Sequence, residues 1–497
     1  MKLRHFPAAG LVLLGSVLLI SVLAVPAPAG TGAFDALFLD ETLRIDYFHT
    51  GDAAAEIVAL DQLWRQGTWA GSRVHLVDDL DLGRYDAKLL DSGGTVIFSR
   101  GFDSYFAEWQ STGPAAEGVR RTYHESVLVP FPKGPVTFTL ESRRDDGSWE
   151  EIFRLGIDPD DFMIREDPLP DGVIVVPAVN PADSHGCVDV AIVGEGYTAD
   201  EIAKFQDDVS RFRDAMLRQE PYRSRQEKFK IWGVLAPSQE SGCDEPSRGV
   251  HRRTSLGCTF DSLGSERYLL TEDNRAMRDV AAHVPYDVLY VMVNHERYGG
   301  GGIYNLFCTF TSDNQFSEYV FLHEFGHSFA GLADEYYTSS TAYNDFYPLG
   351  IEPRERNVTR LLDRGRLKWA DRVTPGTPTP TPWHKDDYDL MDIAYQKKRG
   401  EINDRIARLM REGAPEADVA AAKAEGEALS LTHQQEVDAW FAANEASGRV
   451  GAFEGAGYCS EGMYRSELDC IMFTKGIKPF CAACRGGINE VIERYTE

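Results

Sequence analysis

The chain has 497 residues, of which 43% are hydrophobic and 26% are charged, a composition typical of globular proteins rather than of disordered or membrane-embedded ones. Its formal net charge is −27, and such a field repels phosphate backbones and anionic lipid surfaces. No local basic patch offsets this charge, so we exclude nucleic acid as a partner and expect a protein or peptide substrate, or a metal ion.

The N-terminus has the pattern of a secretory signal peptide. Lys2 and Arg4 form a short basic segment, residues 11–25 are apolar, and residues 27–29 (Ala-Pro-Ala) offer small side chains for cleavage. We therefore predict a signal peptide at residues 1–29 and a secreted or periplasmic protein; an uncleaved N-terminal anchor is the alternative. No later segment approaches the ~20 apolar residues of a membrane span, so we expect the processed chain to be soluble. Losing two basic residues would take its formal charge from −27 to −29.

Residues 30–165 are predicted to form a small antiparallel β-sandwich domain. Short segments of alternating polarity are separated by turn sequences such as Ser92-Gly93-Gly94, a pattern typical of such domains. The predicted strands are residues 43–48, 87–91, 95–99, 125–131 and 135–143. This region contains no cluster of catalytic side chains, so we expect it to dock substrate or to cover one face of the molecule.

Residues 166–497 form a second predicted domain, in which strands and helices alternate as in an α/β sheet covered by helices. Its predicted strands are residues 188–193, 229–236 and 287–293, with an edge strand at 303–311 after a glycine run. A capping box, Thr198 to Glu201, should open one helix, and a second helix is expected around residues 266–283. Residues from about 385 to 447 are charged and alanine-rich, which predicts an inserted pair of surface helices without catalytic duty.

Eight cysteines in an exported chain favour a disulfide framework. We expect Cys243 to pair with Cys258, and the four C-terminal cysteines to pair among themselves. The alternative is a structural zinc site in which Cys481 and Cys484 act with Cys459 and Cys470. The eight positions are Cys187, Cys243, Cys258, Cys308, Cys459, Cys470, Cys481 and Cys484.

The strongest chemical signal is the segment His323-Glu324-Phe325-Gly326-His327. On a helix, residues four apart lie on one face about 6 Å from each other, so His323 and His327 can bind one zinc ion. Glu324 is then placed to act as general base on a zinc-activated water. The preceding residues, 316–322, are apolar enough for a buried helix, and a bound metal explains why such a helix carries these polar groups.

Catalytic zinc needs three protein ligands and one open position. In the metzincin pattern a glycine lies three residues after the second histidine, and the third ligand lies six residues after it. Here Gly331 and Asp334 follow His327 by four and seven residues, so the spacing is longer by one. We predict Asp334 as the third ligand, with Glu335 as the competitor. If neither binds, a ligand from a distant helix, as in gluzincins, is required.

Two further residues complete the predicted site. Metzincins place a methionine-containing turn beneath the metal as an apolar floor, and Met472 lies in the most turn-like apolar setting downstream. Tyr464 is a candidate for oxyanion stabilisation, with an ordinary structural role as the alternative.

The motifs together resemble the IgA-peptidase-type metallopeptidase family, metallopeptidase family sixty-four. They are VGEGYTADE, YGGGGIYN, HEFGHSFAGLADEY, GAFEGAGYCSEGMYR, CIM and FCAAC. The resemblance implies a metzincin-like zincin catalytic domain, of mixed α+β and α/β character, behind an N-terminal β-domain. It further implies a zinc endopeptidase with His323, His327 and Asp334 as metal ligands and Glu324 as the catalytic residue. It does not imply that immunoglobulin A is the substrate.

Two other functions remain open at this point. One is a catalytically silent protein that binds an envelope or host polymer through its β-domain. The other is a metal-dependent hydrolase of non-peptide amides. The intact triad His323, Glu324 and His327 argues against the first of these.

Overall fold

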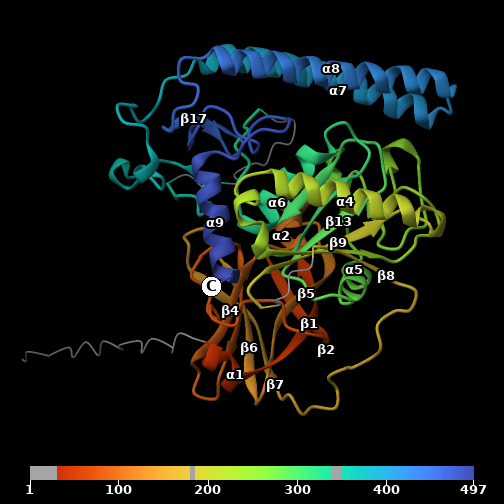
Figure 1. Ribbon diagram of the computed structural model, residues 1–497, viewed down its shortest axis with the longest axis vertical. Coiled ribbons are helices and arrows are strands. Elements are labelled where there is room, and N and C mark those ends of the chain that lie inside the picture. The colour runs from red at the N-terminus through yellow and green to blue at the C-terminus, as the bar shows by residue number, and fades with distance from the viewer. Residues whose placement is uncertain (1–30, 180–184, 339–346, 348–349, 497) are drawn as a thin grey trace, which may run out of the picture.

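The computed structural model describes residues 31–179, 185–338, 347 and 350–496, so the predicted signal peptide, residues 1–29, lies outside the described residues. Figure 1 shows the N-terminal strands at one end of the molecule and an α/β core in the middle. Two long helices, α7 (Lys385–Arg411) and α8 (Glu416–Ala443), cover the other end. Within the described part of the chain, every helix is too short or too polar to cross a lipid bilayer.

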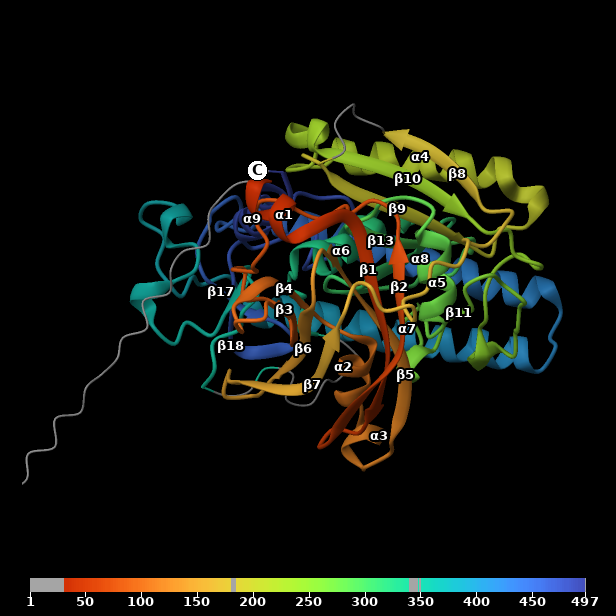
Figure 2. The ribbon, with the colours of Figure 1, turned by 90° about the horizontal axis from the view of Figure 1, so that it is seen from below.

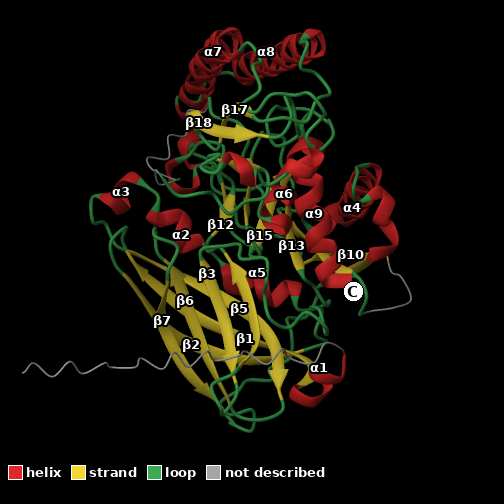
Figure 3. Ribbon diagram, turned by 90° about the vertical axis from the view of Figure 1, so that its left-hand side faces the viewer, coloured by secondary structure: helices red, strands yellow, loops and turns green. Residues whose placement is uncertain are grey.

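The N-terminal region folds into two antiparallel sheets with strand orders β2-β1-β5 and β4-β3-β6-β7, drawn as the lower group of arrows in Figure 3. The inner faces of both sheets share one buried core that includes Ile45, Tyr85 and Phe138. This confirms the antiparallel β-region predicted from the sequence. Its elements are α1 (Thr31–Leu37), β1 (Phe38–Gly51), β2 (Glu56–Gln66), β3 (Tyr85–Leu90), β4 (Val96–Phe102), α2 (Tyr105–Gln110), α3 (Gly113–Ala116), β5 (Arg121–Pro132), β6 (Val136–Arg143) and β7 (Trp149–Ile157).

Two strands of this region, β2 and β7, are absent from the sequence prediction. Both carry several charged residues, and most of their side chains are at least partly exposed. The alternation of apolar and polar residues that marks a half-buried strand is therefore weak in both. They pair with β1 and β6, in which most of the side chains are buried.

A six-stranded sheet in the order β14-β15-β13-β9-β10-β8 forms the centre of the molecule. Its inner strands run parallel, whereas β8 and β14 are antiparallel edges. Every residue of β9 and β13 is buried, which explains why β13 is continuously apolar and why β9 is apolar except at Asp189 and Glu195. The strands are β8 (Ile174–Val179), β9 (Val188–Glu195), β10 (Phe229–Leu235), β13 (Val288–Val293), β14 (Gly300–Ile303) and β15 (Phe307–Thr311).

Two helices cover opposite faces of this sheet. Val190 and Ile192 belong to the core that contains α4 (Ile202–Arg218), and the alternate residue Val193 belongs to the core that contains α5 (Asn274–Ala281). Figure 2 shows α4 lying along β8 and β10. The predicted capping box of Thr198 is present ahead of α4. The second predicted helix is shorter than expected, because part of its range forms β12 (Leu270–Thr271), which pairs with β11 (Cys258–Thr259).

The predicted edge strand at residues 303–311 is wrong in detail. This segment contains a turn at Asn305, whose φ is 53°, and only its second half forms β15, an inner strand. The edge strand is β14, built from the glycine run before the turn.

The C-terminal region packs beside the central sheet. The helices α7 and α8 form a hairpin held by a small apolar cluster that includes Ile402, Ile406 and Ala422. A three-stranded sheet in the order β16-β18-β17 follows, and the last helix packs against the histidine-bearing helix. The remaining elements are β16 (Val358–Thr359), β17 (Phe453–Ala456), β18 (Cys459–Arg465) and α9 (Ala482–Thr496).

Candidate active site

The histidine-bearing helix, α6 (Ser317–Ala330), is buried on most of its surface. One side packs Phe321, Phe325 and Phe329 into the aromatic core under the central sheet. The opposite side carries His323, Glu324 and His327, which face a large cavity. The apolar sequence around the motif is therefore explained by burial of the helix, as predicted.

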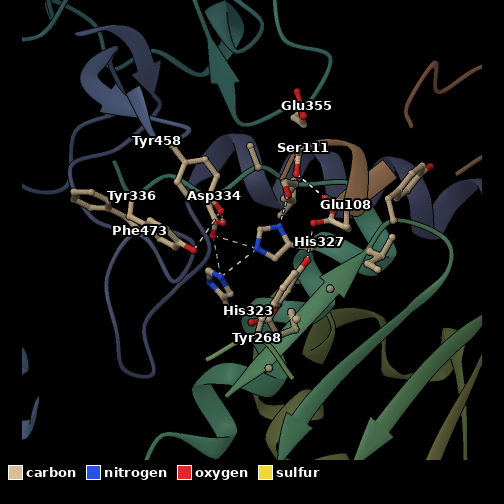
Figure 4. Close-up of a pocket in the computed structure, with 18 of the residues that line it drawn as sticks. Glu108, Ser111, Tyr268, His323, His327, Asp334, Tyr336, Glu355, Tyr458 and Phe473 are labelled. Carbon is tan, nitrogen blue, oxygen red and sulfur yellow. Dashed lines mark hydrogen bonds and ion pairs between the residues drawn. The ribbon is translucent and has the colours of Figure 1, made fainter. Parts of the chain in front are cut away.

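The two histidines and Asp334 converge on one point (Figure 4). The Nε2 atoms of His323 and His327 are 3.2 Å apart. Asp334 Oδ1 lies 3.1 Å from the first and 3.2 Å from the second. Three ligands that share a tetrahedral zinc at about 2.0–2.1 Å would be ~3.3 Å apart. The triangle thus has the dimensions of one face of a zinc coordination shell.

Backbone carbonyls fix the orientation of both imidazoles. His323 Nδ1 lies 3.0 Å from the carbonyl oxygen of Ile471, and His327 Nδ1 lies 2.6 Å from that of Leu332. A carbonyl oxygen can only accept, so each Nδ1 must donate a proton. In the neutral ring, Nε2 is then the atom with the free lone pair, and it points at the shared position, as in metal-binding histidines.

The turn after α6 selects which carboxylate reaches the histidines. Gly331 ends the helix in the left-handed conformation, with φ 54° and ψ 36°, which costs a glycine little. The chain then returns so that Asp334 faces the two imidazoles. Glu335 turns the other way, and its Oε1 lies 3.2 Å and 3.1 Å from the sulfur atoms of Cys481 and Cys484. Of the two carboxylates considered from the sequence, the structure brings only Asp334 to the histidines.

Two tyrosines that the sequence analysis did not identify support this cluster. The hydroxyl of Tyr458 donates a hydrogen bond to Asp334 Oδ2, and the ring of Tyr336 stacks on that of His323 with centroids 6.3 Å apart. Tyr458 comes from the turn between β17 and β18, more than a hundred residues beyond α6, and only its place in the motif GAFEGAGYCSEGMYR pointed to it. The predicted Tyr464 instead lies on β18, outside the residues that line the cavity.

The charges of the cluster reinforce one another. Burial acts to raise the pKa of Asp334, but the imidazoles of His327 and His323 outweigh it and hold that pKa well below its usual range. Burial likewise acts to lower the pKa of His327, but the Asp334 carboxylate raises it to about 9. Asp334 therefore stays ionised, so its carboxylate is available to bind a cation.

Glu324 lies beside this triangle, half-buried, on the same side of α6. Burial is the main cause that raises the pKa of its carboxyl. The edge strand β14 passes directly over it, because a Cβ on Gly300 would lie 2.6 Å from Val320, and one on Gly302 would lie 2.6 Å from the Glu324 carbonyl oxygen. The glycine run thus lets an extended strand touch the helix, which is a common reason for glycine within a strand.

The cavity above the triangle has a volume of about 900 Å³. Its walls include Glu108 of α2, the edge strand β14, and Tyr395, Arg399 and His433 of the α7–α8 hairpin. Glu108 accepts a hydrogen bond of 2.8 Å from the Tyr268 hydroxyl at the cavity wall. The N-terminal region, which we expected to dock substrate or to cover one face of the molecule, and the hairpin, which we expected to have no catalytic duty, therefore both shape the space next to the histidines.

Met472 lies under α6. A Cβ on Gly326, between the two histidines, would be 2.8 Å from the Met472 sulfur, so this methionine packs against the turn of the helix that carries both rings. In the same turn, the carbonyl oxygen of Ile471 accepts the hydrogen bond from His323 Nδ1. The predicted position of Met472 beneath the site agrees with this packing.

The expected disulfides are not formed. None of the eight cysteines forms a disulfide bond, and this includes Cys243 and Cys258, which we expected to pair. In the C-terminal group, the sulfur atoms of Cys470 and Cys484 are 3.8 Å apart, well beyond the ~2.05 Å of a disulfide bond. Cys459, which the zinc alternative included, lies outside the cluster of Cys470, Cys481 and Cys484, and Glu335 takes its place.

A buried helix with two histidines one turn apart, a carboxylate from the following turn, and a glutamate at the edge of a large cavity are features of hydrolytic metalloenzymes. The sequence matches the family described as IgA Peptidase M64 over residues 176–492. Residues 33–154 match the description Peptidase M64 N-terminus. The chain therefore belongs to the IgA Peptidase M64 family, whose members are metallopeptidases. Among curated proteins, no match is found.

Proposed function

We propose that this protein is an exported zinc endopeptidase in which His323, His327 and Asp334 hold the metal and Glu324 is the general base. The observation that carries the proposal is the triangle of Nε2, Nε2 and Oδ1 atoms, with sides of 3.1 to 3.2 Å. Both rings are fixed by carbonyls so that their lone pairs face it. Export rests on the basic and apolar segments of residues 1–29.

The donor set suits zinc. Two imidazole nitrogens and one carboxylate oxygen are ligands that catalytic zinc accepts, and three protein ligands leave one position open. The open side of the triangle faces the cavity, whereas its other side is closed by α6 and the Met472 turn. When bound, the ion supplies Lewis-acid chemistry that makes water more acidic and a peptide carbonyl more electrophilic.

Glu324 performs the proton transfers. Its carboxylate takes a proton from the attacking water, and then passes this proton to the nitrogen of the departing amine. Burial raises the pKa of Glu324, which makes its carboxylate a stronger base in the first step. Tyr458 and the carbonyls of Ile471 and Leu332 hold the ligands in place and take no part in the proton transfers.

The substrate is bound as an extended chain along β14. This strand is the edge of the central sheet, it lines the cavity, and it runs beside Glu324. An edge strand offers unpaired backbone groups that can pair with a peptide. The backbone of Gly300 already forms hydrogen bonds with residues 267 and 269. The substrate therefore pairs with the following residues of the strand.

Peptide cleavage and zinc content, measured on the same preparations, test the proposal. The wild type should hold zinc and cleave casein or a peptide library. Glu324→Gln should keep the metal and lose at least about 100-fold in kcat/KM, the range that a general base contributes. Glu318→Gln is the matched control, because Glu318 lies on the same helix and pairs with Arg218, at 3.0 Å, away from the site.

Two results would overturn the proposal. Unchanged cleavage by Glu324→Gln would exclude Glu324 as the general base. A wild type that holds zinc but cleaves no peptide would favour a binding protein on a peptidase fold.

A further inference from the structure

A second cluster of metal-binding side chains lies behind the proposed active site. Glu335, Cys470, Cys481 and Cys484 place one carboxylate oxygen and three sulfur atoms within 4.8 Å of one another. All four residues are buried, with at most 1% of the surface of any of them exposed. We propose that these residues bind a structural zinc ion, independently of the ion in the active site.

The sulfur positions fit a shared ion and not a disulfide. Sulfur atoms around a tetrahedral zinc, each at about 2.3 Å from it, are ~3.8 Å apart. The Cys470 and Cys484 sulfurs are 3.8 Å apart. Glu335 Oε1 lies 3.1 Å from Cys484 Sγ and 3.2 Å from Cys481 Sγ. With three cysteines in the group, any disulfide would leave one thiol without a partner sulfur, whereas one ion uses all three.

Backbone amides point at the sulfur atoms. The amide of Cys481 donates to Cys470 Sγ at 3.2 Å, and the amide of Met472 donates to the same atom at 3.4 Å. The amide of Cys484 donates to Cys481 Sγ at 3.4 Å. A thiol is a weak acceptor, so amides aimed at sulfur favour thiolates, the form in which cysteine binds a metal.

Hydrogen bonds compensate only partly for the burial of the Glu335 carboxylate. Its Oε1 accepts a hydrogen bond of 3.1 Å from Asn357, but its Oε2 is buried and has no hydrogen-bond partner among the described residues. Leaving a buried carboxylate oxygen unpaired is costly. A cation coordinated by this carboxylate removes that cost, and it also explains why three thiolates gather in an apolar core.

The site would be closed and structural. Four protein ligands complete a tetrahedral shell and leave no position for water, and soft sulfur ligands select zinc over magnesium or calcium. The ligands come from three segments, which are the chain after α6, the Met472 turn, and the start of α9. Each of the first two segments also supports the active site, through Asp334 next to Glu335 and through Ile471 next to Cys470.

Metal analysis of the full-length protein tests this inference. The wild type should contain two zinc ions per chain, and the double variant His323→Ala/His327→Ala should retain one. After replacement of zinc by cobalt, both proteins should show the near-ultraviolet absorption band of sulfur-to-cobalt charge transfer. The band should be lost in Cys481→Ser and kept in Cys459→Ser, the matched control with a cysteine outside the cluster.

The outcomes separate this inference from the proposed function. A double histidine variant without metal, a cobalt protein without the sulfur band, or a native disulfide between any two of the three cysteines found by mass spectrometry would overturn it. A wild type with one ion and a strong sulfur band would support the structural site and contradict the active-site zinc. If Cys481→Ser does not fold, the wild type and the double histidine variant still decide the question, because neither alters the cysteines.

Discussion

Asp334 and Glu335 are adjacent in the chain, yet their carboxylates belong to different clusters. Asp334 Oδ1 lies 3.1 Å from His323 Nε2, whereas Glu335 Oε1 lies 3.1 Å from Cys484 Sγ. One short stretch of chain therefore supplies a carboxylate to each cluster. The segment after Gly331 thus connects the proposed active site with the proposed structural site.

Gly331 should be needed for this arrangement. Replacing it with alanine places a Cβ at φ 54°, 3.2 Å from Leu82 and Tyr304. The left-handed conformation costs alanine about 1–2 kcal/mol, so we expect a lower Tm and weaker zinc binding. Gly331→Asn should lose less stability, since asparagine tolerates this conformation. Thermal unfolding and chelator competition would measure both effects, and equal Tm values for Gly331→Ala and the wild type would contradict the role given to this turn.

Tyr458 should act on metal affinity through Asp334. Tyr458→Phe removes the hydrogen bond to Asp334 Oδ2, and loss of such a partner typically lowers metal affinity by about 10- to 100-fold. Competition with a fluorescent zinc chelator would measure the change. Tyr464→Phe is the control and should bind zinc as the wild type does, because Tyr464 lies outside the cavity lining. A larger loss of zinc affinity in Tyr464→Phe than in Tyr458→Phe would contradict the role that we assign to Tyr458.

The helix that carries the histidines could be predicted because its signal is local, with spacing and apolar flanks within fifteen residues. The choice between Asp334 and Glu335 depended on the backbone turn at Gly331, which the sequence indicated without fixing its direction. Tyr458 and Glu335 act through contacts with residues more than a hundred positions away, and such contacts have no local pattern. The sequence therefore suggested Cys459 as the fourth member of the C-terminal cysteine cluster, whereas the structure has Glu335 in that place. The glycine run did carry a usable signal, since glycines within a strand indicate close approach of another backbone.

The α7–α8 hairpin should contribute to substrate binding. Arg399 of α7 lines the cavity and lies over the ring of Tyr298, 5.3 Å from its centroid. A partly exposed charge contact contributes about 1 kcal/mol or less, so Arg399→Ala should raise KM for an acidic peptide by up to about fivefold and leave kcat unchanged. Lys398→Ala, at the exposed neighbouring position, should change neither. Steady-state kinetics with acidic and neutral peptides would show the difference, and a fall in kcat alone would contradict a binding role.

A buried acidic pair in the central sheet should make stability depend on pH. The Asp287 carboxylate accepts a hydrogen bond of 2.9 Å from the backbone amide of Asp189. Burial raises the pKa of both carboxyls, and for Asp287 the charge of Asp189 raises it further. In the unfolded chain both would ionise near pH ~4. Between that pH and neutrality the folded state holds more protons than the unfolded state, so the free energy of unfolding falls as pH rises.

Asp287→Asn removes part of this titration and keeps an oxygen that can accept from the Asp189 amide. The Tm of the variant minus that of the wild type should therefore increase from about pH 5 to about pH 8. Thermal unfolding in excess zinc would measure it, since excess zinc limits metal loss at low pH. For Asp207→Asn, a control at an exposed position, the Tm of the variant minus that of the wild type should stay constant over this pH range. If the Tm of Asp287→Asn minus that of the wild type decreased as pH rises, the result would contradict a raised pKa for Asp287 in the folded protein.

The most direct test of the proposed active site is anomalous diffraction at the zinc absorption edge from crystals of the wild-type protein. We predict a peak about 2.0–2.2 Å from His323 Nε2, His327 Nε2 and Asp334 Oδ1, with Glu324 beside it but not bound to it. A peptidase-active crystal form with no peak between these three atoms, or with Glu335 in place of Asp334 as the third ligand, would contradict this assignment.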